Sequence, residues 1–275
     1  MSLPPRLTPE GPMEARGVLL ACYGPKGGAG RSTLATNLAI ALRQATARET
    51  LLFDAACQFG ELDLFLNLQP RLGIPTVLGG GHLDAALTPH PTGLHLLGWT
   101  KSDRSVSPEK LKGLLQNLRQ RDAWIVIDTH PALNEINRVV LELADRIFVP
   151  FFLDLAHLRA LQRDLTLLTE GGCDVGRAEL VAWAEKSDLS WHDAANIIRR
   201  PISYQLPYDP EAARSAINQG VPMIQGDPHG AFAREMYKLI EPLLGPRSTA
   251  LVSLQHPLSG LLAWFRRGTA SGLGF

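Results

Sequence analysis

The stretch CYGPKGGAGRSTLATNLAIAL, residues 22–42, decides how the rest of the sequence is interpreted. An apolar run leads into a glycine-rich turn, and a helix is expected to begin near Arg31. A strand, a glycine turn and a helix in this order direct backbone N–H groups and a helix N-terminus at one point, which suits an anion. Gly27, Gly28 and Gly30 permit a close approach. The stretch therefore predicts a phosphate-binding loop.

The side chains of this loop follow the P-loop pattern G-x-x-x-x-G-K-[ST] with two departures. Pro25 stands at the first glycine, and Arg31 stands at the lysine. Ser32 is expected to ligate Mg²⁺, and the hydroxyl of Thr33 to bond a phosphate oxygen. An additional lysine, Lys26, comes early in the loop. Arg31 keeps the positive charge of the usual lysine, but its planar fork does not fit one phosphate cradle in the same way as a compact ammonium.

The composition favours a compact globular chain. Of 275 residues, 45% are hydrophobic and 20% are charged, which is enough for one large core. Lys and Arg number 27 and Asp and Glu number 27, so the net charge of zero argues against specific or nonspecific nucleic-acid binding. The three cysteines, Cys22, Cys57 and Cys173, form no disulfide or metal pattern, and we expect buried thiols in a reducing compartment.

The two ends of the chain differ from its middle. Residues 1–16 are rich in proline and glycine and lack a signal-peptide core, so they are expected to be a flexible lead-in. No run approaches the roughly 18 apolar residues that span a bilayer, which predicts a cytoplasmic protein. The C-terminal tail, 247–275, contains an amphipathic helical pattern over 254–267. That helix is expected either to contact a membrane surface or to pack on its own domain or a partner subunit.

Between these ends, short apolar runs alternate with stretches of helical period. This alternation predicts an α/β fold with a mostly parallel, twisted sheet of six to eight strands flanked by helices, in one domain over residues 17–246. The expected strands are 17–23, 50–54, 94–99, 124–128, 146–152, 180–185 and 203–206. The expected helices are 31–45, 108–121, 133–143, 154–170, 190–199, 209–219 and 229–243. The glycine- and proline-rich stretch 70–93 is expected to hold one short helix.

Several ordered blocks resemble one family. KGGAGRST resembles the deviant Walker A loop of the MinD/ParA family of P-loop ATPases. FDAACQFGELDLFLNL (53–68) is similar to the second motif and switch I of that family, WIVIDTHPALN (124–134) to its Walker B strand and switch II, and LPYDPEAARSAINQGVPMI (206–224) to its late proline-aspartate segment. The second and the late block resemble most closely the CpaE/TadZ branch, which localises type IV (Tad) pilus secretion machinery at a cell pole.

The resemblance implies a P-loop NTPase fold, ATP or ADP with Mg²⁺ as cofactor, and a homodimer formed through the nucleotide face. Lys26 would reach across that dimer to the partner's nucleotide. The implied metal residues are Ser32, Asp54 and Asp128. The implied nucleotide-binding residues are Lys26, Gly27, Gly28, Ala29, Gly30, Arg31, Ser32, Thr33, Pro207 and Tyr208.

Three positions bear on hydrolysis and base recognition. Ala56 replaces the second aspartate of the family's DxD motif, and losing a water-positioning group lowers turnover by about 100-fold or more. Asp63 or Asp128 is the alternative group for that water. Trp183 occupies the region where the family often places an asparagine that reads adenine. We therefore expect weak or absent hydrolysis, with Lys26 in trans and Arg31 as the candidate catalytic groups.

Three functions remain open at this stage. The first is a nucleotide-dependent dimer that recruits or places a pilus, secretion or other polar assembly, in the cytoplasm or on the inner face of the membrane. The second is an inert scaffold that has lost its ligand, and the third is a chromosome or plasmid partition ATPase. The histidines lack metal-ligand spacing and are expected to be solvated or capping, although His130 falls in switch II. Arg199 and Arg200 are expected at a helix C-terminus.

Overall fold

The computed structural model describes residues 16–46, 48–57, 60–100 and 106–244. The expected lead-in, apart from Arg16, and the amphipathic pattern at 254–267 lie outside the described residues. Within that part of the chain, no helix has the length and apolar character needed to cross a bilayer.

The described strands form one eight-stranded sheet in the order β3-β4-β2-β5-β1-β6-β7-β8. Neighbouring strands run parallel except β3 and β4, which are antiparallel. The strands are β1 (Val18–Cys22), β2 (Glu49–Asp54), β3 (Thr88–Pro89), β4 (His95–Leu97), β5 (Ala123–Asp128), β6 (Arg146–Phe151), β7 (Ala178–Ala184) and β8 (Tyr204–Pro207). The mostly parallel α/β fold is confirmed.

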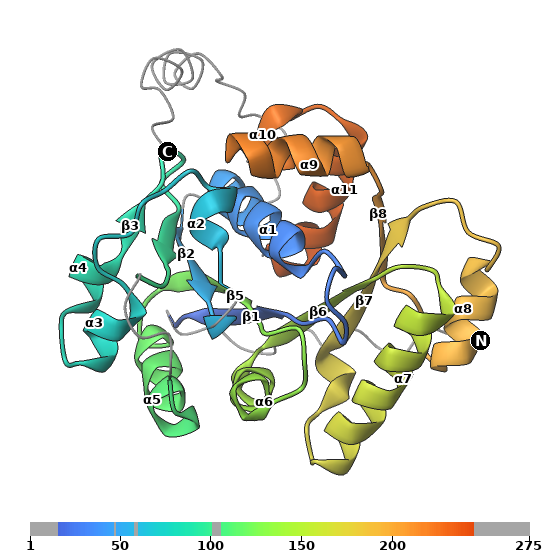
Figure 1. Cartoon of the computed structure of the whole chain (residues 1–275), viewed down its shortest axis with the longest axis horizontal. Helices are drawn as coiled ribbons and strands as arrows, with labels where there is room; N and C mark the ends of the chain where they lie inside the picture. The colour runs from blue at the N-terminus through green and yellow to red at the C-terminus, as the bar shows by residue number, and fades with distance from the viewer. Residues whose placement is uncertain (1–15, 47, 58–59, 101–105, 245–275) are drawn as a thin grey trace.

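Helices cover both faces of the sheet (Figure 1). One face carries α1 (Arg31–Thr46), α2 (Leu62–Phe65), α9 (Pro210–Gln219), α10 (Met223–Gly226) and α11 (Ala231–Ile240). The other face carries α3 (Ile74–Leu78), α4 (Leu83–Ala86), α5 (Pro108–Leu118), α6 (Glu135–Leu143), α7 (Leu155–Glu170) and α8 (Trp191–Ile198). Two 3₁₀ turns, η2 (Val175–Arg177) and η3 (Glu241–Leu243), complete the described elements.

The central strand β1 shows why two layers of helices are needed. Its alternate residues Leu19 and Ala21 belong to the apolar cluster that includes residues of α5 to α8, whereas Leu20 and Cys22 belong to the cluster that includes residues of α1 and α11. All four residues have no exposed surface. A strand that is apolar on both faces is typical of a parallel sheet buried between two layers of helices. The C-terminal end of β1 therefore lies in the middle of the sheet, between β5 and β6.

Some local expectations were wrong. The stretch 70–93 holds two short helices, α3 and α4, rather than one, and it also contributes β3. The strand expected over 94–99 is only β4, because the backbone carbonyl of Gly98 accepts from the N–H of Ile74 at the start of α3. Cys22 is buried as expected, but Cys57 and Cys173 are only half-buried.

Candidate nucleotide site

The glycine loop lies between β1 and α1, at the carboxyl edge of the strand flanked by β5 and β6. Gly28 and Gly30 have φ of 79° and 77°, which favour glycine, and Lys26, Gly27 and Gly28 are exposed. A Cβ added to Gly27 or Gly28 would meet nothing within 4 Å, so the outer side of the loop is open. Helix α1 begins at Arg31, so its N-terminal amides directly follow this loop.

The two aspartates that the sequence selected stand next to each other. Asp54 ends β2 and Asp128 ends β5, and they are paired in the register of these parallel strands. Ser32 Oγ donates a 2.6 Å hydrogen bond to Asp128 Oδ2. Asp128 Oδ1 is buried and has no hydrogen-bond partner in the part of the chain that the structure describes.

These oxygens fit Mg²⁺. Mg²⁺ is commonly bound by one or two protein oxygens, with water and phosphate oxygens completing its octahedron. Ser32 Oγ and the Asp128 carboxylate would hold the ion, which would neutralise phosphate charge. Burial raises the pKa of Asp128 to about 6, opposed by the Ser32 hydrogen bond and by the charge of Arg31. At neutral pH the carboxylate is mostly ionised, as a metal ligand needs to be.

Asp54 is fixed by its surroundings. Its Oδ1 accepts the N–H of Ala56 at 3.0 Å, and its backbone carbonyl accepts the indole N–H of Trp99 at 2.9 Å. Gly60 passes so close to the Asp54 carboxylate that a Cβ at Gly60 would collide with it. Gln58 and Phe59 of the expected switch I lie outside the described residues. The loop after β2 therefore returns directly against the expected metal residue.

Arg31 lies under the loop. Its Nη1 donates a long, 3.4 Å hydrogen bond to the carbonyl of Gly24, and a Cβ on Gly24 would come within 2.9 Å of Arg31 Cγ. The Nε atom is buried without a partner among the described residues. Burial lowers the pKa of Arg31, while the charge of Asp128 raises it. The guanidinium is thus turned toward the base of the loop in this structure.

Aromatic side chains surround one end of the loop. Trp183, at the end of β7, donates its indole N–H to the carbonyl of Ala29 at 2.9 Å. Its ring stacks on Phe152 at a centroid distance of 6.2 Å. Tyr208 contacts Phe152 edge-on at 5.1 Å and is 41% exposed, and Pro207 ends β8 beside it. Tyr208 is therefore linked to the glycine loop through the rings of Phe152 and Trp183.

The histidines differ in their surroundings. His130 Nδ1 accepts the N–H of Ala132. The expectation of solvated or capping side chains is wrong for His90 and His157, which are buried. Arg199 caps the C-terminus of α8, and Arg200 donates to the carbonyls of Val175 and Ala178. Both arginines act at a helix end, as expected.

Sequence reasoning missed a buried contact at the root of the loop. Tyr23 donates a short hydrogen bond from its hydroxyl to Asp164 Oδ2 on α7. Arg163 Nε donates to the other oxygen of Asp164 at 2.9 Å. Burial raises the pKa of Tyr23, and the bond to Asp164 raises it further. No local pattern could have found this pair, because the two residues are 141 positions apart.

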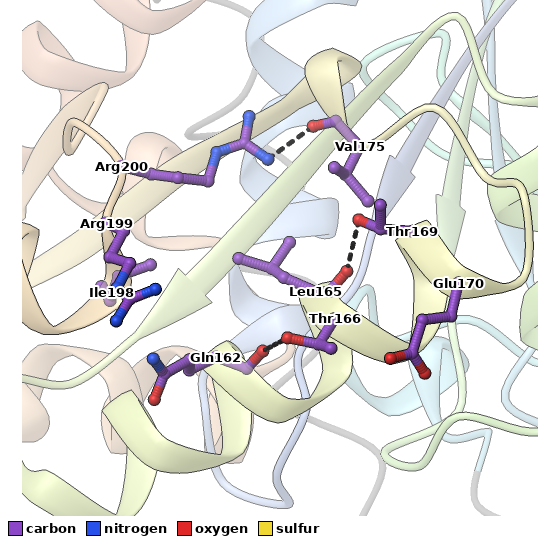
Figure 2. A pocket seen from close by; sticks show the side chains of 9 residues that line it. All are labelled: Gln162, Leu165, Thr166, Thr169, Glu170, Val175, Ile198, Arg199 and Arg200. Atoms are coloured by element: carbon purple, nitrogen blue, oxygen red, sulfur yellow. Dashed lines mark hydrogen bonds between the residues drawn. The ribbon is translucent and has the colours of Figure 1, made fainter.

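Two cavities lie away from the glycine loop. One of about 280 Å³ lies between the C-terminal half of α7 and the end of α8, with Arg199 and Glu170 at opposite ends (Figure 2). It adjoins Val175, ahead of β7, and so belongs to the amino edge of the sheet. The second, of about 350 Å³, follows β6 and β7 between Asp154 and Asp188. Neither is lined by the candidate nucleotide or metal residues, so the candidate site is argued from the geometry of the glycine loop.

Known proteins share sequence similarity with most of the chain. No protein-family model matches the chain. An uncharacterised ATP-binding protein of Methanocaldococcus jannaschii is 22% identical over 239 residues, 85% of this chain and 90% of that protein. A putative septum site-determining protein MinD of Emiliania huxleyi is 27% identical over 216 residues, 74% of this chain and 78% of that protein.

Solved structures share the fold. A ParA family ATPase of Chlorobium tepidum superposes with a TM-score of 0.75 at 22% identity, covering 84% of this chain and 99% of the other. The septum site-determining protein MinD of Pyrococcus horikoshii, complexed with Mg-ADP, gives 0.72 at 20% identity, covering 82% and 96%. The chain therefore has the P-loop fold of MinD and ParA ATPases.

Proposed function

We propose that this chain is a nucleotide-dependent positioning protein that binds ATP or ADP with Mg²⁺. The observation that carries the proposal is the hydrogen bond between Ser32 and the buried Asp128, below an open glycine loop and beside Asp54. Backbone amides at a helix N-terminus supply the phosphate site, and the paired oxygens supply a metal site next to it. A triphosphate with Mg²⁺ needs these two sites together.

The descriptions of similar proteins support this proposal. One is described as ATP-binding, one as septum site-determining, and a protein of the same fold was solved with Mg-ADP. We extend these properties to this chain as a hypothesis about a positioning ATPase of the MinD/ParA type. The pattern of residues 53–68 and 206–224 favours the CpaE/TadZ branch, with a pilus, secretion or other polar assembly as the cargo.

Association is part of the proposal. Lys26 is exposed at the open side of the loop, where a second copy could approach the nucleotide. We propose a homodimer through the nucleotide face, with Lys26 contacting the partner's phosphate. The pattern at 254–267 would add a peripheral contact with the inner face of the membrane.

We also propose that this chain hydrolyses ATP slowly or not at all. A fast ATPase needs a cation on the transferring phosphoryl group and a group that orients water. Arg31 is turned under Gly24, and the side chain at position 56 is a methyl group that is 4% exposed. We propose that nucleotide binding controls association and that turnover is weak or absent.

Titration calorimetry with Mg-ADP and Mg-ATP tests the binding step. Wild-type protein should bind both, and chelation of Mg²⁺ should weaken ATP binding. Ser32→Ala should remove most of this magnesium dependence. Ser107→Ala is the matched control, because Ser107 also precedes a helix, α5, and its Oγ accepts the N–H of Lys110 at the helix start. Absence of binding by the wild-type protein would favour the inert scaffold instead.

Light scattering after size-exclusion chromatography tests association. With ATP and Mg²⁺ the wild-type protein should double its mass, and Lys26→Ala should stay monomeric while still binding nucleotide. Lys110→Ala, an exposed lysine on α5, is the control that should still dimerise. A nucleotide-dependent shift of plain duplex DNA in a gel would favour the partition ATPase, and unchanged mass of the wild-type protein would contradict the dimer.

A further inference from the structure

Trp183 makes a contact with the glycine loop that the proposed function does not use. The indole N–H donates to the carbonyl of Ala29 at 2.9 Å, and Trp183 is only 4% exposed. The ring also lies against the Cα of Gly30, because a Cβ there would come within 2.7 Å of Trp183 Cζ2. One side chain at the end of β7 thus touches two successive residues of the loop.

The direction of the indole N–H is fixed by the packing around it. The ring lies against Phe152, from the segment after β6, and is stacked nearly parallel to the ring of Phe232 of α11, with an interplanar angle of 7° and a centroid distance of 6.4 Å. Both neighbours are anchored in different layers of the fold. Offset aromatic stacking of this kind restricts rotation of the ring. The indole N–H of Trp183 is therefore fixed in direction, and the carbonyl of Ala29 has to point toward it.

The acceptor carbonyl belongs to the peptide bond that also carries the amide of Gly30. A planar trans peptide holds its C=O and N–H in opposite directions, and no cis peptide occurs in the described residues. Because Trp183 draws the Ala29 carbonyl inward, the N–H of Gly30 points away from the indole. Gly30 immediately precedes α1, so this N–H is one of the amides at the helix N-terminus.

We propose that Trp183 is a positioning residue for phosphate binding: its N–H holds the Ala29–Gly30 peptide so that the Gly30 amide is presented to the phosphates. The inference rests on the proposed nucleotide-binding function and adds a residue to it. Trp183 does not touch the ligand in this account. Without its N–H, the peptide of a glycine can rotate, and the bound geometry is populated for less of the time.

Replacement of Trp183 by benzothienylalanine tests the proposal, because sulfur replaces the N–H while the ring shape is kept. Calorimetry should show about a fivefold weaker Kd for both Mg-ADP and pyrophosphate, as expected for one net hydrogen bond. Trp183→Phe should weaken both to at least the same extent. The matched control is benzothienylalanine at Trp191 on α8, which should leave both affinities unchanged.

The outcomes separate the possible roles. If the Trp183 replacement lowers the melting temperature but leaves both Kd values unchanged, the indole is only a core residue and the proposal is overturned. Weaker ADP binding with unchanged pyrophosphate binding would show a contact with the base, which also overturns it. If the wild-type protein binds neither ligand, the proposed function fails together with this inference.

Discussion

Gly30→Ala is the substitution whose cost follows most directly from the structure. Gly30 has φ of 77°, in the left-handed region, where an alanine costs about 1–2 kcal/mol. The new methyl group would also lie 2.7 Å from Trp183 Cζ2, in a ring held by Phe152 and Phe232. Overpacking of this kind costs about 1–3 kcal/mol. The two effects together predict about 2–5 kcal/mol of lost folding stability.

Thermal and urea unfolding measure this loss. For a domain of this size, a loss of 2–5 kcal/mol lowers Tm by about 4–20 °C. Gly113→Ala is the control, because a Cβ at Gly113 in α5 meets nothing within 4 Å and alanine is the better helix former. That variant should gain about 0.5–1 kcal/mol. An unchanged Tm for Gly30→Ala would refute the argument that the loop backbone and the indole are in rigid contact.

Three further predictions concern chemistry, pH and the root of the loop. The double variant Arg31→Lys with Ala56→Asp should raise phosphate release at least about tenfold, measured by a coupled phosphate assay, since it restores a compact cation and a water-orienting carboxylate. Burial lowers the pKa of His90 from 6.5 to about 4, so the unfolded chain binds a proton at a higher pH than the folded protein does. The free energy of unfolding should therefore decrease as the pH is lowered. Urea unfolding should show a loss of about 2 kcal/mol between pH 7.5 and pH 5, and a smaller loss in His90→Gln. Tyr23→Phe should cost about 1.5–3 kcal/mol in urea unfolding, because it removes a buried hydrogen bond to the Asp164 carboxylate.

The positions in the fold that the sequence predicted correctly are those fixed by their own segment. Asp54 and Asp128 each end a buried apolar run, and parallel strands place such ends at one edge. The helix expected from residue 108 begins at Pro108, where Ser107 Oγ accepts the N–H of Lys110. The turn of the glycine loop is likewise set by glycines within it, since Gly28 and Gly30 have positive φ. Local signals of this kind need no knowledge of distant neighbours.

The missed features depend on residues far apart in the chain. Trp183 was noted only as a departure from a family pattern, since its acceptor, Ala29, is 154 positions away. The contact of Arg31 with the carbonyl of Gly24 depends on the close approach of its side chain to Gly24, which the sequence does not specify. The strand β3 has two residues and exists through its pairing with β4. Short elements of this type are stabilised by tertiary contacts more than by their own propensity.

The order of the strands has a consequence for assembly. The outermost strands are β3, whose second residue is Pro89, and β8, whose last residue is Pro207. Short border strands with proline offer few free amides to an incoming chain, so they discourage fibre growth and strand exchange between molecules. Copies of this protein can then meet through helices and loops, where a contact can be made and released without opening the hydrogen bonds of the sheet.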